Sequence, residues 1–132
     1  MATLLIVDDS VDTREFCELI GKMFSMRVHQ ALNADDAIKQ VDGGLIPDLI
    51  LLDLMMPGSP PQIFVERLKS DIRLKNSKIV IMSAIREVNG VAREMGADGS
   101  LRKPFDMAAF VDTLRRYSLT GPQEEILAAS SL

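Results

Sequence analysis

Two residue types that often mark a chemical site, cysteine and histidine, are almost missing from this chain of 132 residues. The single cysteine, Cys17, cannot form an internal disulfide and fits a reducing compartment. Its neighbours are ordinary helix formers, so we interpret Cys17 as a packing residue rather than a nucleophile. The single histidine, His29, lies on a weak strand pattern and is expected to be structural. Any site must therefore use other side chains.

The chain also has no hydrophobic run long enough to span a membrane, and its start, MATLLIVDDS, lacks a basic region and a small-residue cleavage site. We therefore expect a cytoplasmic protein without a membrane partner. The net charge of -4 argues against broad binding to a phosphate backbone, so no direct contact with nucleic acid is expected. A hydrophobic content of 47% suits one compact domain, which we assign to residues 1–117, with 118–132 as a tail or linker stub.

Short apolar runs alternate along the chain with patterns of helical period. Because parallel neighbours need a crossover helix, this alternation predicts an α/β fold with a doubly wound sheet of five parallel strands and five helices. Asn33 and Asp106 are expected to cap helices, and Gly96 suits a left-handed helix end. The predicted strands are 3–8, 27–31, 49–53, 78–84 and 99–103, and the predicted helices are 11–25, 34–42, 61–72, 86–95 and 107–117.

The helical spacing also predicts which side chains face the core. Methionines on these faces are interpreted as core filler. The predicted inner faces are Phe16, Leu19, Ile20, Met23 and Phe24 in the first helix, Ala34, Ala37, Ile38 and Val41 in the second, Phe64, Val65, Leu68 and Ile72 in the third, Val88, Val91, Ala92 and Met95 in the fourth, and Met107, Phe110, Val111 and Leu114 in the fifth.

Polar side chains follow four of the five predicted strands. Asp8 and Asp9 end the first, Asp53 ends the third, Ser83 the fourth and Lys103 the fifth. The carboxyl ends of parallel strands share one edge of the sheet, which is where open α/β sheets bind ligands. We therefore expect these five side chains to meet there, with Asp53 at the centre.

Three carboxylates at one place repel one another, and a divalent cation relieves that repulsion. Oxygen-only ligands suit Mg²⁺, with Mn²⁺ as a second option. Lys103 adds a point charge for an anionic oxygen, and Ser83 adds a hydroxyl donor. This set predicts a cradle for a phosphoryl group, with in-line attack by the Asp53 carboxylate on phosphorus.

With these motifs in order, the chain resembles the receiver domains of two-component response regulators. The resemblance covers residues 3 to about 117 and rests on VDDS, LLDLMMP, IMSA and RKPF. It implies the flavodoxin-like strand order 2-1-3-4-5, for which a chemotaxis receiver is a known example. It also implies that Asp53 is the phosphoacceptor and a direct Mg²⁺ ligand, with Asp9 a second direct ligand, Asp8 acting mainly through water and the Met55 backbone carbonyl completing the shell.

The same resemblance implies that Ser83 and Lys103 bind the phosphoryl oxygens and that the Lys103-Pro104 bond is cis. One departure concerns signalling, because the family often has an aromatic residue three positions before the lysine, where this chain has Ser100. Without that aromatic lever, signal transfer is expected to involve the loop after Ser83 and the fourth helix, or order supplied by a bound partner.

The implied partners are a histidine kinase or histidine phosphotransfer protein, and an output protein or domain that binds the face of the fourth helix, fifth strand and fifth helix. The function so predicted is a phosphorylation-controlled binding module, which is not an enzyme beyond accepting and losing its own phosphoryl group. The alternative is a Mg²⁺-dependent phosphohydrolase with an aspartyl-phosphate intermediate, which usually needs a general acid and a substrate cap. A receiver-like protein that is never phosphorylated is disfavoured, because every acidic and cationic position is filled.

Overall fold

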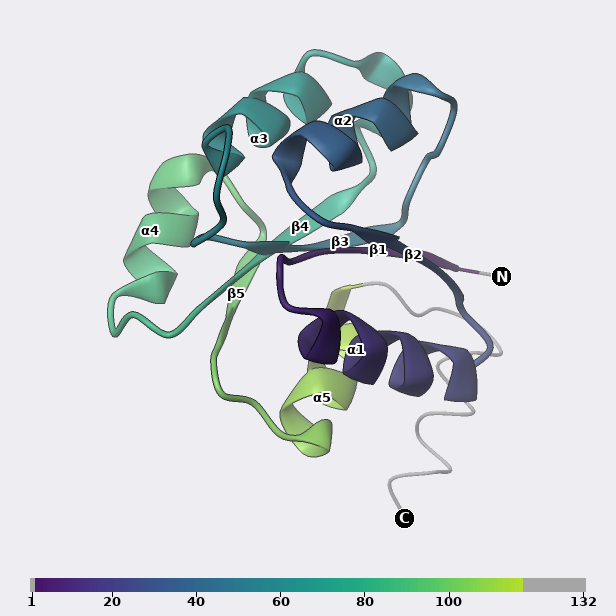
Figure 1. The fold of residues 1–132 in the computed structure, drawn as a ribbon, viewed down its shortest axis with the longest axis vertical. Helices are drawn as coiled ribbons and strands as arrows, with labels where there is room; N and C mark the ends of the chain where they lie inside the picture. The colour runs from purple at the N-terminus through teal and green to yellow at the C-terminus, as the bar shows by residue number, and fades with distance from the viewer. Residues whose placement is uncertain (1, 118–132) are drawn as a thin grey trace.

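The computed structural model describes residues 2–117 as one parallel sheet covered by helices on both faces (Figure 1). The strand order is β2-β1-β3-β4-β5 and every pairing is parallel, which confirms the predicted α/β class and topology. No helix among the described residues is long and apolar enough to cross a membrane. The elements are β1 Thr3–Val7, α1 Val11–Met23, β2 Arg27–Ala31, α2 Ala34–Asp42, β3 Leu49–Asp53, α3 Pro61–Lys69, the short 3-10 helix η1 Ile72–Leu74, β4 Lys78–Ser83, α4 Val88–Met95, β5 Gly99–Arg102 and α5 Met107–Tyr117.

The central strands are buried on both faces, because side chains alternate between two hydrophobic clusters. Leu5, Ile50 and Ile81 pack under α2, α3 and α4, whereas Leu4 and Leu51 pack against α1 and α5. Figure 1 shows the same division, with α1 and α5 on one side of the sheet and the other three helices on the opposite side. The run of five buried residues in β3 is therefore a core strand that carries Asp53 to its end.

The predicted inner face of α1 was wrong by about one residue. Phe16, Leu19 and Met23 are 37%, 63% and 58% exposed. The buried face instead contains two small residues, Cys17 and Gly21. A Cβ added to Gly21 would lie 2.8 Å from Cγ2 of Val28, so α1 packs closely on the sheet through its small residues. Counting large apolar residues alone therefore misplaced the stripe by about one residue, and Ile20 and Phe24 are the two predicted inner residues that are buried.

Smaller corrections concern the ends of helices. The third helix ends at Lys69 rather than Ile72, because Asp71 caps a separate 3-10 turn through its hydrogen bond from the Arg73 amide. Ile72 is consequently 77% exposed. Met107 begins α5 and is 42% exposed, so neither it nor Met23 is core filler. Other inner-face predictions hold in full or in part: Ala34, Ala37, Val41, Phe64, Val65, Leu68, Val88, Ala92, Phe110 and Leu114 are buried, and Ile38, Val91, Met95 and Val111 are partly buried.

The predicted caps are present. Asn33 Oδ1 accepts a hydrogen bond from the Asp36 amide, and Asp106 Oδ1 accepts one from the Ala109 amide. Gly96 has φ 76°, the left-handed conformation expected at that helix end. Cys17 is fully buried, and this burial raises the pKa of its thiol to about 12, as suits a packing residue. The predicted tail, 118–132, lies outside the described residues.

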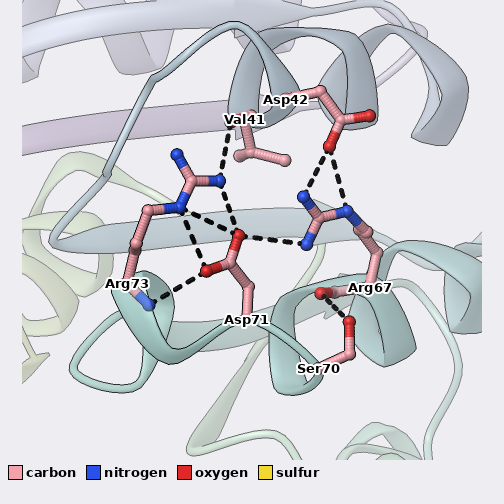
Figure 2. Close-up of polar contacts among 6 residues, drawn as sticks. All are labelled: Val41, Asp42, Arg67, Ser70, Asp71 and Arg73. Atoms are coloured by element: carbon pink, nitrogen blue, oxygen red, sulfur yellow. Dashed lines mark hydrogen bonds and ion pairs between the residues drawn. The ribbon is translucent and has the colours of Figure 1, made fainter.

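An ion-pair cluster of Asp42, Arg67, Asp71 and Arg73 joins the end of α2 to the end of α3 and to η1 (Figure 2). Arg67 Nη2 lies 2.6 Å from Asp42 Oδ1, and its Nη1 lies 3.2 Å from Asp71 Oδ2. Arg73 Nη2 lies 2.5 Å from the same Asp71 oxygen. Two arginines and two aspartates are thus matched in this cluster.

Candidate functional site

The acidic edge, which we define as Asp8, Asp9 and Asp53, lies at the carboxyl ends of β1 and β3. Asp8 follows β1 and is fully buried, and Asp53 is the last residue of β3 and is 4% exposed. Asp9 points to a more open position and is exposed. One oxygen from each of the three carboxylates lies within 4.8 Å of the others. The structure therefore brings Asp53 next to the Asp8–Asp9 pair, although Asp8 precedes it by 45 positions in the sequence.

Lys103 reaches the same place from the loop after β5. Its Nζ lies 2.5 Å from Asp8 Oδ2 and 3.5 Å from Asp53 Oδ1. Its backbone amide donates to the Ser83 carbonyl at 2.9 Å, which holds the residue at the end of the sheet. The Lys103-Pro104 peptide bond is cis, as the resemblance implied. One ammonium group thus lies between two buried carboxylates.

The charges at this edge do not balance, and the pKa values show it. Burial, followed by the nearby Asp8 carboxylate, raises the pKa of Asp53 from 3.8 to about 6, although Lys103 acts in the opposite direction. For Lys103, burial acts to lower the pKa, but the hydrogen bond to Asp8 and the charge of Asp53 raise it overall. The ammonium therefore stays charged, while the Asp53 carboxylate is held in an unfavourable ionised state at neutral pH.

Arg14 supports the site and was missed by the sequence analysis. It lies on the buried face of α1, is 8% exposed, and donates from Nη1 to the Asp8 carbonyl at 2.8 Å. Its Nε donates to Gln30 Oε1 at 2.9 Å, and Gln30 in turn donates to Glu18. This network fixes the backbone that carries Asp8. The one available signal was the position of Arg14 three residues before Cys17, on what proved to be the inner face.

Ser83 and Met55 flank Asp53 in different ways. Ser83 ends β4, is 1% exposed, and its Oγ accepts a hydrogen bond from the Ile85 amide at 3.3 Å. The Met55 amide donates to Asp53 Oδ1 at 3.4 Å, and the Met55 side chain is 69% exposed. The metal-binding role predicted for the Met55 carbonyl stays a prediction. Met55 thus contacts the Asp53 carboxylate through its amide, and Ser83 lies at the end of the neighbouring strand β4.

Ser100, at the position where the family often has an aromatic residue, makes a polar contact. Its Oγ donates to Asn89 Oδ1, which joins β5 to α4. Ser100 is only partly exposed, and it pairs with Ile81 of β4 in the sheet register. The place of an aromatic side chain is therefore taken by a short link between the fifth strand and the fourth helix.

The donor set of the acidic edge fits a hard divalent cation. All of its side-chain ligands are carboxylate oxygens, which Mg²⁺ and Mn²⁺ favour, and one of them is exposed. The Lys103 ammonium supplies part of the positive charge that a bound cation would bring, because its Nζ already contacts Asp8 and Asp53. The geometry therefore suits a site where a cation and an anionic group share the space around Asp53.

Comparison with known proteins agrees with this geometry. The profile of the response regulator receiver domain matches residues 4–115. Sporulation initiation phosphotransferase F of Bacillus subtilis is 29% identical over 120 residues, covering 86% of this chain and 91% of that protein. The phosphate regulon transcriptional regulatory protein PhoB of Pseudomonas aeruginosa is 33% identical over 126 residues, covering 91% of this chain and 53% of that protein.

Among solved structures, the chemotaxis response regulator CheY4 of Vibrio cholerae superposes with a TM-score of 0.81 at 26% identity, covering 89% of this chain and 98% of that one. The chain spans nearly all of the sporulation protein but only about half of the transcriptional regulator. The shared region is thus the receiver domain itself, which in this family is a signalling module rather than a classical enzyme. The chain belongs to the response regulator receiver domain family.

Proposed function

We propose that this protein is the phosphoacceptor of a two-component phosphorelay, phosphorylated on Asp53 with Mg²⁺ and controlling the binding of a partner. The observation that carries the proposal is the position of Asp53, which ends a buried strand between an acidic pair and the Lys103 ammonium. A nearly buried carboxylate with surplus negative charge around it is costly unless it has a cation or a chemical role. Accepting a phosphoryl group with the help of Mg²⁺ would give the Asp53 carboxylate both a cation and a chemical role.

In the proposed reaction, an Asp53 oxygen attacks phosphorus in line with the bond to the donor's histidine nitrogen. The new oxygen–phosphorus bond forms as the nitrogen–phosphorus bond breaks, and the nitrogen keeps the electron pair and later takes a proton. Bound Mg²⁺ would supply positive charge for the phosphoryl oxygens, with Asp9 and Asp53 as direct ligands and Asp8 through water. Lys103 and the Ser83 hydroxyl would bind the remaining phosphoryl oxygens.

Lys103 gives this proposal a specific feature. In this structure its ammonium forms ion pairs with Asp8 and Asp53. Once Asp53 is phosphorylated, the same ammonium must also interact with the phosphoryl group. A cation at the acidic edge would compensate Asp8 and release Lys103 for that task. The requirement for Mg²⁺ then follows from charge balance among the side chains, because one ammonium does not balance three carboxylates.

The donor protein is proposed to dock on α1 and on the loop before α5. There, Val11 and Leu19 are 50% and 63% exposed, although both are apolar. A cavity of about 520 Å³ opens beside them, lined by Phe16, Phe105 and Lys103 among others. An apolar surface that leads to Lys103 suits a helical partner that presents a phosphohistidine, because it combines burial of apolar area with access to Asp53.

The output is proposed to bind the face formed by α4, β5 and α5, where Ser100 and Asn89 are linked. One relative is named a phosphotransferase and another a transcriptional regulator, so the family supplies more than one kind of output. We propose residues 1–117 as the receiver domain, 118–132 as a C-terminal tail or linker stub, and a cytoplasmic location. The phosphohydrolase alternative is not favoured, because position 55, beside the acceptor, holds an exposed methionine rather than a general acid.

The test is to incubate the protein with Mg²⁺ and a small phosphodonor and to measure its intact mass. We expect a phosphate-sized gain in the wild type, none in Asp53→Asn, and none when Mg²⁺ is chelated. Asp112→Asn is the matched control, because Asp112 is an exposed aspartate on α5 that pairs with the exposed Arg116. A wild type that gains no phosphate, or an Asp53→Asn protein that gains as much, contradicts the proposal.

A further inference from the structure

A basic pocket lies at the edge of the sheet opposite the acidic edge, where β4 and β5 begin. It has a volume of about 310 Å³ and is formed by the end of α3, the segment from η1 into β4, and the end of α4. Its floor is apolar, from Leu68, Leu74 and Ile79, which are all buried. Its rim holds three ammonium groups, Lys69, Lys75 and Lys78.

The side chains of these lysines differ from those of the cations at the acidic edge and in the ion-pair cluster. Lys103, Arg67, Arg73 and Arg14 all have carboxylate or carbonyl partners, whereas within residues 2–117 the ammonium groups of the three pocket lysines make no ion pair and no hydrogen bond. Three like charges around one small volume repel one another and favour a bound anion. Among residues 2–117, no carboxylate forms an ion pair with any of the three lysines.

The acidic groups near the pocket do not neutralise it. Asp98 lines it, but one of its oxygens is held by the Ile79 amide at 2.8 Å, and it lies in no ion pair within the described region. Glu66 and Glu94 line a neighbouring groove that also includes Lys69, again without an ion pair. Three ammonium groups therefore face a single carboxylate across the pocket itself, which leaves an excess of positive charge.

One of the lysines is held against the pocket wall. A Cβ added to Gly96 would clash with Lys69 Nζ, so this ammonium lies over the end of α4, although Lys69 as a whole is exposed. The negative end of the α4 dipole explains that position. It does not by itself account for Lys75, which follows η1, or for Lys78, which begins β4. The cluster as a whole is thus more than a capping arrangement.

We propose that this basic pocket binds a small anion that carries more than one phosphate group, such as a pyrophosphate moiety. Lysine ammonium groups bind phosphate as point charges, and a pocket of about 310 Å³ is at the small end of ligand sites. The Ser77 hydroxyl already donates to the Pro47 carbonyl at 2.6 Å, so recognition rests on the ammonium groups and hence on charge. The site lies away from Asp53 and does not depend on phosphorylation.

The test is a titration of the ¹⁵N-labelled chain with inorganic pyrophosphate, without Mg²⁺ and at constant ionic strength, followed by amide chemical shifts. We expect saturable shifts in 68–79 and 96–98. Replacing all three lysines by glutamine is expected to weaken binding by about tenfold or more, because each loses a charge-assisted contact. Single replacements such as Lys78→Gln are expected to weaken pyrophosphate binding by a smaller factor. These single variants provide the test if the triple variant does not fold.

The matched control replaces three exposed cations that lie away from the pocket. It carries Arg27→Gln, Lys39→Gln and Arg86→Gln, so its net charge equals that of the triple variant. The control is expected to bind as the wild type does. Non-saturable shifts, shifts at the acidic edge alone, or equal weakening in the control and the triple variant would overturn the proposal.

Discussion

The acidic edge and the ion-pair cluster contain the same kinds of charge but in opposite balance. At the acidic edge, three carboxylates face one ammonium, and two of the carboxylates are nearly inaccessible to water. In the ion-pair cluster, two aspartates face two arginines near the surface (Figure 2). The pKa of Asp53 is raised to about 6, whereas the hydrogen bonds from the Arg73 side chain and backbone hold the pKa of Asp71 well below its usual range.

This contrast separates a structural arrangement from a reactive one. Matched charges at the surface lower the free energy of the fold a little, and they leave no uncompensated charge that a ligand could neutralise. Surplus charge in a buried place raises the free energy of the fold until a proton, a cation or a covalent change relieves it. Asp53 is thus held in the state that a phosphoryl group and a cation would stabilise, and Asp71 is not.

The largest effect is expected from Lys103→Met without divalent cations. This change removes the ammonium that lies 2.5 Å from the buried Asp8 carboxylate and leaves that charge uncompensated. We expect a loss of about 3 kcal/mol in the free energy of unfolding at neutral pH, the usual cost of breaking a buried pair. Urea denaturation measures it. Mg²⁺ is expected to restore part of the loss, and Lys39→Met, an exposed change on α2, is the control.

A loss as small as that of Lys39→Met would show that Asp8 is not compensated by Lys103. The acidic edge would then resemble the ion-pair cluster in its tolerance of change. A large loss that Mg²⁺ does not reduce would separate the stabilising role of Lys103 from cation binding.

An effect of the opposite sign is expected from Asp53→Asn. In the wild type, Asp53 binds a proton below about pH 6 when folded but only below 3.8 in its ordinary state, so stability falls as pH rises through that window. Removing the charge should therefore stabilise the protein by about 2–3 kcal/mol at pH 8 and by almost nothing near pH 4. Denaturation of both proteins across this range, without Mg²⁺, is the measurement.

Stabilisation that stays constant with pH would mean that packing, rather than charge, causes the effect. Asp112→Asn, at an exposed position on α5, is the control and should show no such dependence. Added Mg²⁺ is expected to reduce the difference between wild type and Asp53→Asn, because a cation relieves the same repulsion in the wild type.

The smallest effect is expected in the ion-pair cluster, from Asp71→Asn. The asparagine keeps an oxygen for the Arg73 amide but loses the charge that faces two arginines. Because the pKa of Asp71 is lowered on folding, its contribution is present above pH 4 and declines as pH falls below that value. We expect a small fall in Tm at neutral pH that shrinks at high salt and at low pH, measured by thermal denaturation.

If Asp71→Asn instead raised Tm at neutral pH, the cluster would carry unrelieved charge as the acidic edge does. A fall in Tm that did not respond to salt would point to the lost geometry of the 3-10 turn. Asp36→Asn, another helix-end aspartate that accepts a backbone hydrogen bond, serves as the comparison.

The residues of the site could be predicted from the sequence because each is fixed by a local pattern. A buried strand of five residues places Asp53 at its end without reference to any other part of the chain, and the same holds for Ser83 and for Asp8. Parallel pairing then carries these ends to one edge, since crossover connections leave no other arrangement. The meeting of the acids follows from that logic, whereas the strand order was implied by the resemblance to receiver domains.

Contacts across the sheet were decided by the tertiary structure. The pairing of Lys103 with Asp8 spans 95 positions, and the support of Asp8 by Arg14 depends on which face of α1 is turned inward. That face is set by how closely the helix can approach the sheet at Cys17 and Gly21, which the count of large apolar residues does not reveal. Local patterns thus determined where the charges lie, and packing decided which of them neutralise one another.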